Sequence, residues 1–226
     1  MDVTYPVEDE LLEEWDWESA RPTGRVISRA RAHREGVPHE GVHLWIVRNS
    51  GADAELLFQH RAAFKEMYPG CYDITVGGHV PFGWNENKIQ KEADEELGIS
   101  PSDDQLVDLG YFRYEEKNEW LFHRELQRVY LLPDNRELNR YTFRDGEVDG
   151  ICAVPIAGLV SLFRADGILE AEAFDGSSSR RIQISRADFH PLLFAPSMER
   201  YVDVLLTAVR EYASGGRVSV KMPSPV

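Results

Sequence analysis

Three glutamates with helical spacing, Glu92, Glu95 and Glu96, are the residues of this chain most suited to metal chemistry. In a helix, Glu92 lies three and four residues before Glu95 and Glu96, so the three side chains share one flank. Carboxylates gathered in this way repel one another and have raised pKa values unless a cation lies among them. Mg²⁺ or Mn²⁺ fits this role, because either ion binds carboxylate oxygens and keeps open positions for phosphate and water.

The residues around the glutamates predict a loop-helix-loop unit. Ile89, Ala93 and Leu97 are spaced four apart and form an apolar stripe that can face a core. The double glycine Gly77-Gly78 predicts a turn before the helix, and Gly98 stands at the expected C-cap position. An acidic helix face alone is more often a solvated surface. The flanking glycines favour the metal-binding interpretation.

This unit resembles the Nudix box, whose pattern is G-x5-E-x7-R-E-U-x-E-E-x-G-U with U apolar. The segment from Lys91 to Ile99 matches the second half of the pattern, with Lys91 in the arginine position. The first half departs from it, because Gly77 is the leading glycine and Gly83 replaces the first glutamate. The departures put the loop geometry and the salt bridge made by the arginine in doubt.

If the resemblance holds, it implies roles for the three helix glutamates. Glu95 and Glu96 are then the main metal ligands, and Glu92 is a further ligand or the residue that orients the attacking water. The implied fold is a Nudix-type α/β/α sandwich around a mixed β-sheet.

Flanking residues resemble the isopentenyl diphosphate isomerase-like branch of this superfamily, from about His33 to Val148. The isomerases have Cys-Gly-His, with an essential cysteine, where this chain has Gly77-Gly78-His79, so the thiol is absent. In those enzymes, histidines matching His79 and approximately His33 and His39 help to hold a second metal. Because the spacing of His33 is off by one, we interpret it as a structural residue and assign His79 to phosphate binding.

Three further residues are candidates for the site. Glu125 lies where the isomerase-like enzymes carry a glutamate, which implies a fourth carboxylate that faces the helix cluster as a metal ligand or base. The alternative is a strand-edge glutamate paired with Arg124 or Arg128. Arg61 and Lys65, four residues apart, could bind a diphosphate through their positive charge, or could form an exposed surface pair.

Composition limits the classes of partner. The chain has 226 residues, and its 39 acidic and 25 basic residues give a net charge of −14. This excess disfavours binding to nucleic acid or to anionic membranes, but a metal can still attract a small phosphorylated substrate. The two cysteines, Cys71 and Cys152, argue against a disulfide scaffold and fit a reducing cytoplasm. The sequence does not determine the oligomeric state.

The N-terminal segment is acidic and lacks the apolar core of a signal peptide. We therefore expect that it is not a signal peptide. No apolar run approaches the roughly 20 residues that a membrane span needs. We expect residues 8–17 to form a short helix that packs Leu11, Leu12 and Trp15 on the domain.

Hydrophobic patterns predict alternating strands and helices, and therefore an α/β fold. Residues 1–30 form an acidic arm or short helix, 31–214 a Nudix domain with a C-terminal helix, and 215–226 a flexible tail. Residues 175–181 are expected to be a turn or loop. The expected strands cover 42–47, 54–58, 72–76, 106–112, 126–132 and 151–154, and the expected helices beyond the box cover 156–163 and 197–212.

The sequence therefore predicts an Mg²⁺- or Mn²⁺-dependent Nudix hydrolase that cleaves the P–O–P linkage of a small nucleoside diphosphate-type or other organic diphosphate. Two alternatives remain. One is a diphosphate isomerase, which the absence of a thiol at Gly77 disfavours. The other is a catalytically inactive Nudix-fold protein that binds a ligand, which the changes at Gly83 and Lys91 make plausible.

Overall fold

A computed structural model describes residues 10–49, 54–65, 68–84, 86–117, 119 and 122–223. Its centre is a nine-stranded mixed sheet with the main order β11-β10-β9-β4-β3-β8-β7, while β5 pairs with β4 and β6 pairs with β3. A separate hairpin joins β1 and β2. The strands are β1 (Leu11–Asp16), β2 (Arg21–Ser28), β3 (His39–Asn49), β4 (Ala54–Arg61), β5 (Tyr72–Asp73), β6 (Val76–His79), β7 (Val107–Lys117), β8 (Phe122–Pro133), β9 (Val148–Pro155), β10 (Leu169–Phe174) and β11 (Ser179–Ile184).

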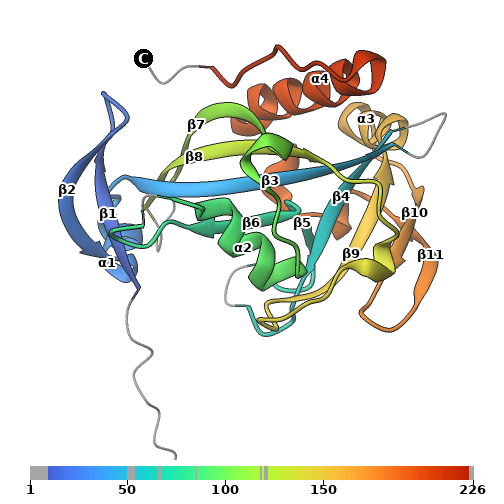
Figure 1. The fold of residues 1–226 in the computed structure, drawn as a ribbon, viewed down its shortest axis with the longest axis horizontal. Coiled ribbons are helices and arrows are strands. Elements are labelled where there is room, and N and C mark those ends of the chain that lie inside the picture. The colour runs from blue at the N-terminus through green and yellow to red at the C-terminus, as the bar shows by residue number, and fades with distance from the viewer. Residues whose placement is uncertain are drawn as a thin grey trace, which may run out of the picture.

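Helices cover both faces of the sheet, with α2 on one face and α3 and α4 on the other (Figure 1). The mixed sheet between helical layers confirms the expected α/β class. None of the helices in the described ranges combines the length and apolar character that crossing a bilayer requires. The α-helices are α1 (Arg29–Glu35), α2 (Lys88–Leu97), α3 (Ile156–Arg164) and α4 (Glu199–Gly215), and short 3-10 helices cover Asp103–Gln105, Leu138–Arg140, Arg186–Asp188, Pro191–Phe194 and Pro196–Met198.

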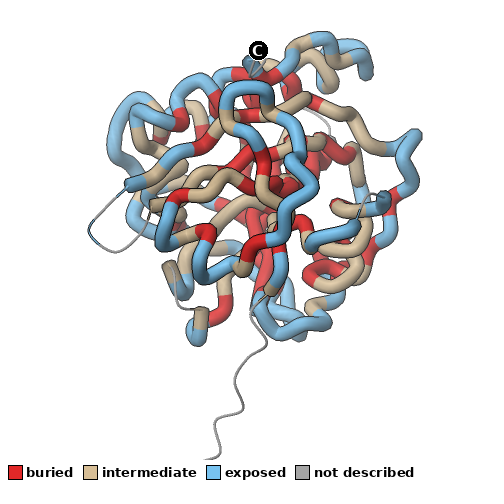
Figure 2. The backbone as a smooth tube through the Cα atoms, turned by 90° about the vertical axis from the view of Figure 1, so that its left-hand side faces the viewer, coloured by how far each residue is buried: buried red, intermediate tan, exposed pale blue. Residues whose placement is uncertain are grey.

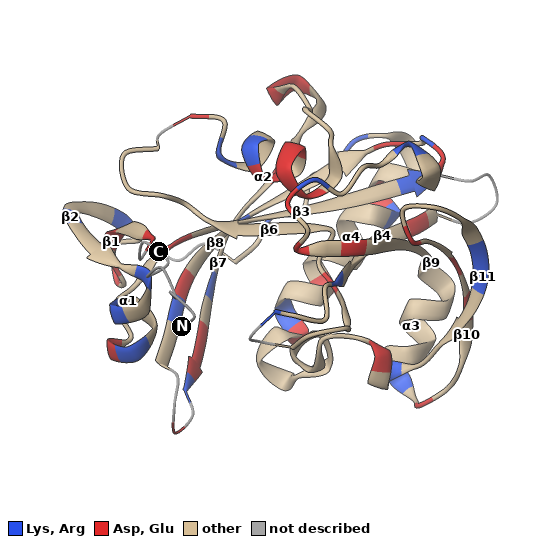
Figure 3. Cartoon of the chain, turned by 90° about the horizontal axis from the view of Figure 1, so that it is seen from below, with Lys and Arg blue, Asp and Glu red and all other residues tan. Residues whose placement is uncertain are grey.

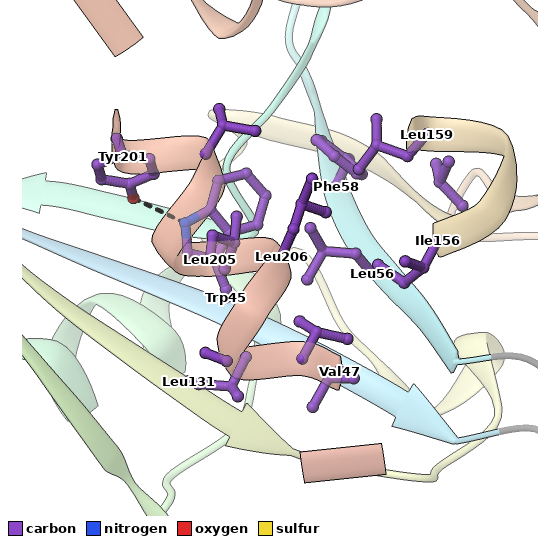
Figure 4. Packing of buried hydrophobic residues seen from close by; sticks show 14 of the residues in the cluster. Trp45, Val47, Leu56, Phe58, Leu131, Ile156, Leu159, Tyr201, Leu205 and Leu206 are labelled. Atoms are coloured by element: carbon purple, nitrogen blue, oxygen red, sulfur yellow. Dashed lines mark hydrogen bonds between the residues drawn. The ribbon is translucent and has the colours of Figure 1, made fainter. Parts of the chain in front are cut away.

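Strand β3 supplies side chains to both cores. Leu44 and Ile46 belong to the core under α2, whereas Trp45 and Val47 belong to the core under α3 and α4. This alternation follows from the two-residue period of a strand, and burial on both faces explains its continuous apolar run. Buried positions run through the central strands, while most connecting loops are exposed (Figure 2). Figure 4 shows the core under α4, where Trp45 packs beside the helix.

The parallel pairing of β3 with β8 matters most for the site. It places His39 opposite Glu125 and continues residue by residue to Val47 opposite Pro133. On its other side, β3 pairs antiparallel with β6, so that Gly41 lies opposite His79 and His43 opposite Gly77. Residues that are far apart in the sequence therefore meet at one end of β3.

The prediction of a helix over residues 8–17 is wrong for those of its residues that the structure describes. Residues 11–16 form strand β1, and residues 8 and 9 lie outside the described ranges. Leu12 and Trp15 are buried as expected, although they stand three positions apart in a strand. A register shift between Glu13 and Trp15 allows both side chains to face inward from a strand, and this spacing imitates a helical one.

The segment around Asp175 is only partly a loop. The turn ends at Ser178, and Ser179 begins β11, which pairs with β10. Strand β11 is largely exposed, so it lacks the alternation that identifies a half-buried strand. The alternating sequence Leu-Glu-Ala-Glu-Ala of β10 was the available signal for this hairpin.

The expected turn at Gly77-Gly78 is also wrong, because both glycines lie in strand β6. The described part of the C-terminal tail, expected to be flexible, makes hydrogen bonds to the rest of the domain. The amide of Met222 donates to the carbonyl of Leu109 at 2.6 Å, and the Met222 side chain is buried. Glu211 of α4 accepts hydrogen bonds from the amides of Ser219 and Val220 at 2.6 and 3.1 Å.

Candidate active site

The C-terminal end of α2 forms the first of two clusters of potential metal ligands. One carboxylate oxygen from each of Glu96, Asp145 and Glu147 lies within 4.8 Å of the others, and we call this group the carboxylate centre. The amides of Arg144 and Asp145 donate to the carbonyl of Glu95 at 3.2 and 3.3 Å. These bonds fix the loop before β9 against the last turn of the helix.

Glu96 is the buried member of the carboxylate centre. Its Oε2 accepts weak hydrogen bonds from Gln59 Nε2 at 3.4 Å and from the amide of Gly77 at 3.3 Å. Burial, followed by the charges of Glu92 and Asp145, raises the pKa of Glu96 well above its usual value. A buried carboxylate beside other carboxylates is unfavourable as an anion without a cation. The all-oxygen donor set fits Mg²⁺ or Mn²⁺.

The other two helix glutamates lie differently from Glu96. Lys91 contacts Glu92 at 3.1 Å and forms an ion pair with Glu95, so the lysine in the arginine position partly neutralises both (Figure 3 shows the mixed charges of α2). Burial raises the pKa of Glu92, whereas the Glu95 side chain is 46% exposed. The geometric cluster at Glu96 therefore contains Asp145 and Glu147 rather than Glu92 and Glu95.

The two side chains expected to bind phosphate, Lys65 and Arg61, contact different parts of the structure. Lys65 pairs with Glu147 and so lies at the edge of the carboxylate centre. Arg61 pairs with Asp73 at 3.2 Å and donates to the carbonyl of Tyr68 at 3.1 Å. Sequence reasoning did not identify Asp145 or Glu147, although two acidic residues around a glycine were visible before β9.

The second cluster is a set of four histidines. One ring nitrogen from each of His33, His39, His79 and His123 lies within 4.8 Å of the others, and we call this group, with Glu125, the histidine centre. Its members come from α1, β3, β6 and β8. The rings of His33 and His123 are 4.5 Å apart, and those of His39 and His123 are stacked at 5.4 Å.

The arrangement of these nitrogens suits a transition-metal ion. The Nε2 atoms of His33 and His79 are 3.2 Å apart, and two nitrogens bound to one tetrahedral Zn²⁺ at about 2.0 Å would be about 3.3 Å apart. His39 Nδ1 lies 3.0 Å from the carbonyl of Val37, a contact that directs the Nε2 lone pair inward. The buried Nε2 atoms of His39 and His123 have no hydrogen-bond partner among the described residues. Imidazole nitrogens with a carboxylate fit Zn²⁺ or Mn²⁺.

Glu125 completes this group. Its Oε1 lies 3.8 Å from His79 Nε2 and 4.0 Å from His123 Nε2, while its Oε2 accepts a hydrogen bond from Gln127 at 2.8 Å. Burial acts to raise the pKa of Glu125, whereas positive charge on the neighbouring histidines would lower it. Burial also lowers the pKa of His39 and His79. Because neutral rings cannot balance a buried anion, a cation among them fits both tendencies.

Several expectations about this group need correction. Glu125 contacts the histidines rather than the carboxylates of α2, and His33, interpreted as structural, belongs to the cluster. The alternative pairs of Glu125 do not form, since Arg124 pairs with Glu115 and Arg128 with Asp108. Sequence reasoning missed His123. The available signal was its position two residues before Glu125, which places both side chains on one face of a strand.

Strand β6 joins the two centres. The amide of Gly77 contacts Glu96, and His79 lies two residues further along, about 7 Å of strand. A Cβ on Gly78 would lie 2.6 Å from the carboxyl carbon of Glu92, too close for a real side chain. The second glycine therefore allows the helix to approach the strand.

The position of the isomerase thiol is filled by other side chains. A Cβ on Gly77 would collide with Ile74 and lie 3.5 Å from Cδ2 of His43. Cys71 is half-buried, its Sγ donates to the carbonyl of Tyr68 at 3.3 Å, and burial raises its pKa to about 11. Cys71 is therefore a poor replacement for a reactive thiol.

Comparisons with known proteins agree with the fold and with the resemblance to Nudix hydrolases. No protein-family model matches the chain. An uncharacterised Nudix hydrolase of Clostridium acetobutylicum is 28% identical over 207 residues, covering 91% of this chain and 99% of that protein. Nudix hydrolase 3 of Arabidopsis thaliana is 32% identical over 142 residues, which are 61% of this chain but only 18% of that protein. A crystal structure from Deinococcus radiodurans, 22% identical, has a TM-score of 0.51 over 67% of this chain and 87% of that one, which supports the fold.

Proposed function

We propose that this chain is a Nudix hydrolase that cleaves the P–O–P linkage of a small nucleoside diphosphate-type or other organic diphosphate. The single observation that carries the proposal is the buried carboxylate of Glu96, held with Asp145 and Glu147 at the end of the box helix. In this proposal Glu96, Asp145 and Glu147 hold Mg²⁺ or Mn²⁺. When bound, such an ion neutralises charge on the diphosphate and lowers the pKa of an attacking water.

The chain's own residues then divide the remaining tasks. Glu92, half-buried with a raised pKa, is suited to orient the attacking water and accept its proton. Lys65, already beside Glu147, can turn its ammonium to a phosphate oxygen. Glu95 remains a candidate outer ligand because its side chain is partly exposed and neighbours Lys91.

We assign a second divalent ion to the histidine centre, with Glu125 as its carboxylate ligand. The different donor sets favour different metals, because carboxylates suit Mg²⁺ whereas several imidazoles suit Zn²⁺ or Mn²⁺. His79, assigned from the sequence to phosphate binding, would then hold metal and contact phosphate only through it. Metal analysis of the purified protein, with and without chelator treatment, tests this assignment.

The hydrolase proposal is tested by a turnover screen over a diphosphate library with Mg²⁺ and Mn²⁺. We expect Glu96→Gln to lower turnover about 100-fold or more, because the variant keeps the shape of the side chain and loses its charge. The matched control is Glu170→Gln on β10, whose side chain is 65% exposed. Full metal-dependent turnover by Glu96→Gln would refute the assignment.

A diphosphate isomerase remains the second candidate, favoured by the combination of histidines with Glu125. Gly77 supplies no thiol, so an isomerase would need a different acid on that side of the substrate. Conversion of isopentenyl to dimethylallyl diphosphate would establish this function. A ligand-binding protein without catalysis would instead show tight calorimetric binding with no phosphate release for any diphosphate or metal.

A further inference from the structure

A hydrogen-bonded network connects β3 to α4 beneath the site. Trp45 Nε1 donates to the hydroxyl oxygen of Tyr201 at 2.7 Å, and the same oxygen lies 3.0 Å from Nδ1 of His43 (Figure 4 draws the bond to Trp45). Trp45 and Tyr201 are both completely buried. The network thus joins the C-terminal helix to the strand that carries His39.

The proton positions in this network follow from the chemistry of the three groups. An indole N–H can only donate, so the Tyr201 oxygen must accept from Trp45. The Tyr201 proton then needs an acceptor, and His43 Nδ1 provides it. A proton on Nδ1 instead would leave the buried hydroxyl without an acceptor, which is unfavourable. Burial lowers the pKa of His43, so the neutral ring carries its proton on Nε2.

The His43 side chain projects from the same face of β3 as Trp45 and His39, and so from the face that carries the histidine centre. His43 is directly opposite Gly77 in the ladder of β3 and β6, and the Gly77 amide contacts Glu96. The ring atom next to Nε2, Cδ2, lies 3.5 Å from the position of a Cβ on Gly77. His43 itself is half-buried, and no described residue is hydrogen-bonded to its Nε2.

We propose that Tyr201 and Trp45 are positioning residues that fix His43 as a neutral Nε2–H donor, which hydrogen-bonds a phosphate oxygen of the substrate on the face of β3 that carries the histidine centre. The identity of the ligand rests on the proposed function, whereas the tautomer does not. A donor fixed before binding needs no reorganisation when charge develops on that oxygen. A neutral imidazole can act in this way without changing its protonation state.

The tautomer is tested directly by nitrogen NMR of the protein labelled in histidine. We expect the wild-type signals of His43, assigned by their loss in His43→Gln, to show a proton on Nε2 and none on Nδ1. Tyr201→Phe removes the acceptor and donor oxygen, so a mixture of both tautomers is expected. Tyr212→Phe, a half-buried tyrosine on the same helix, is the matched control and should leave the signals unchanged. A proton on Nδ1 in the wild-type protein would overturn the positioning role.

The hydrogen bond to phosphate is tested by calorimetric titration with imidodiphosphate in the presence of Mn²⁺. We expect His43→Ala and Tyr201→Phe to weaken binding about fivefold to tenfold, because each loses one fixed hydrogen bond. His43→Gln can place a side-chain N–H near Nε2, so its affinity should exceed that of His43→Ala. Thermal unfolding identifies any variant that fails to fold, and His43→Gln then carries the test.

The outcomes separate this inference from the proposed function. Wild-type affinity in folded His43→Ala would overturn the hydrogen bond to phosphate and leave the hydrolase proposal intact. Failure of the wild-type protein to bind or cleave any diphosphate would refute both the hydrolase and the phosphate contact. The NMR signals of His43 would still decide the role of Tyr201 in that case.

Discussion

A methyl group at position 41, introduced by Gly41→Ala, should disrupt the histidine centre. The substitution leaves every proposed metal ligand in place. A Cβ built on Gly41 lies 2.5 Å from the carboxyl carbon of Glu125, whereas nonbonded carbons approach to about 3.5 Å. The carboxylate would therefore have to retreat by about 1 Å. It has little freedom to do so, because its Oε2 is bonded to Gln127 and its other oxygen faces His79.

We therefore expect Gly41→Ala to destabilise the metal-free protein by about 1–3 kcal/mol, the usual cost of overpacking a buried site. Zn²⁺ affinity at the histidine centre should fall by about 10- to 100-fold, as for other changes that displace a metal ligand. Denaturant unfolding measures the first quantity. Calorimetric titration with Zn²⁺ measures the second, with excess Mg²⁺ present to occupy the carboxylate centre.

The matched control is Gly167→Ala, because a Cβ there meets no atom within 4 Å. This variant should bind Zn²⁺ as the wild-type protein does. Wild-type Zn²⁺ affinity in Gly41→Ala, together with unchanged stability, would refute the argument that Glu125 is held tightly in a metal-binding group.

Three further changes test other parts of the molecule. Glu96→Gln should raise the unfolding temperature of the metal-free protein, because it removes a buried carboxyl group whose pKa is raised. The variant should also lose stabilisation by Mg²⁺, and an unaltered Mg²⁺ response would contradict the carboxylate centre. Hydrogen bonds from Ser219 and Val220 lower the folded pKa of Glu211 below its usual 4.5, so the anchoring of the tail is complete above that pH and is lost as the pH falls. Amide exchange at Ser219 and Val220, corrected for intrinsic rates, should therefore accelerate when the pH is lowered. The variant Glu211→Gln should show fast exchange at these amides already at neutral pH. Slow exchange in that variant would be evidence against the anchoring of the tail by Glu211. Phe58→Ala should lower the free energy of unfolding by about 3–5 kcal/mol, because the Phe58 ring is fully buried against two other aromatic rings. A loss below about 1 kcal/mol in denaturant titration would argue against this packing.

Local rules were sufficient for the helix that carries the glutamates. Ile89, Ala93 and Leu97 are buried as their spacing predicted, and Gly98 ends the helix with a φ of +66°. Each of these features depends on residues within one or two helical turns. For that reason the helix, its apolar face and its end could be predicted from the sequence.

The same local rules failed where a signal had two explanations. The spacing of Leu12 and Trp15 suits a helix, but a β-bulge produces it here. Gly77 and Gly78 suggested a turn, but they lie in a strand because neighbouring side chains need the space. A glycine in the sequence shows only that a side chain is absent. It does not show whether a turn or the close approach of neighbouring atoms requires that absence.

The chain by itself determined the α/β class, the box helix and the individual carboxylates and imidazoles that could bind metal. Only the tertiary structure decided which of them meet. The register of β3 against β8 places His39 opposite Glu125, and the loop before β9 brings Asp145 to Glu96. These groupings depend on strand pairing between distant segments, and a local pattern of residue types carries no information about that register.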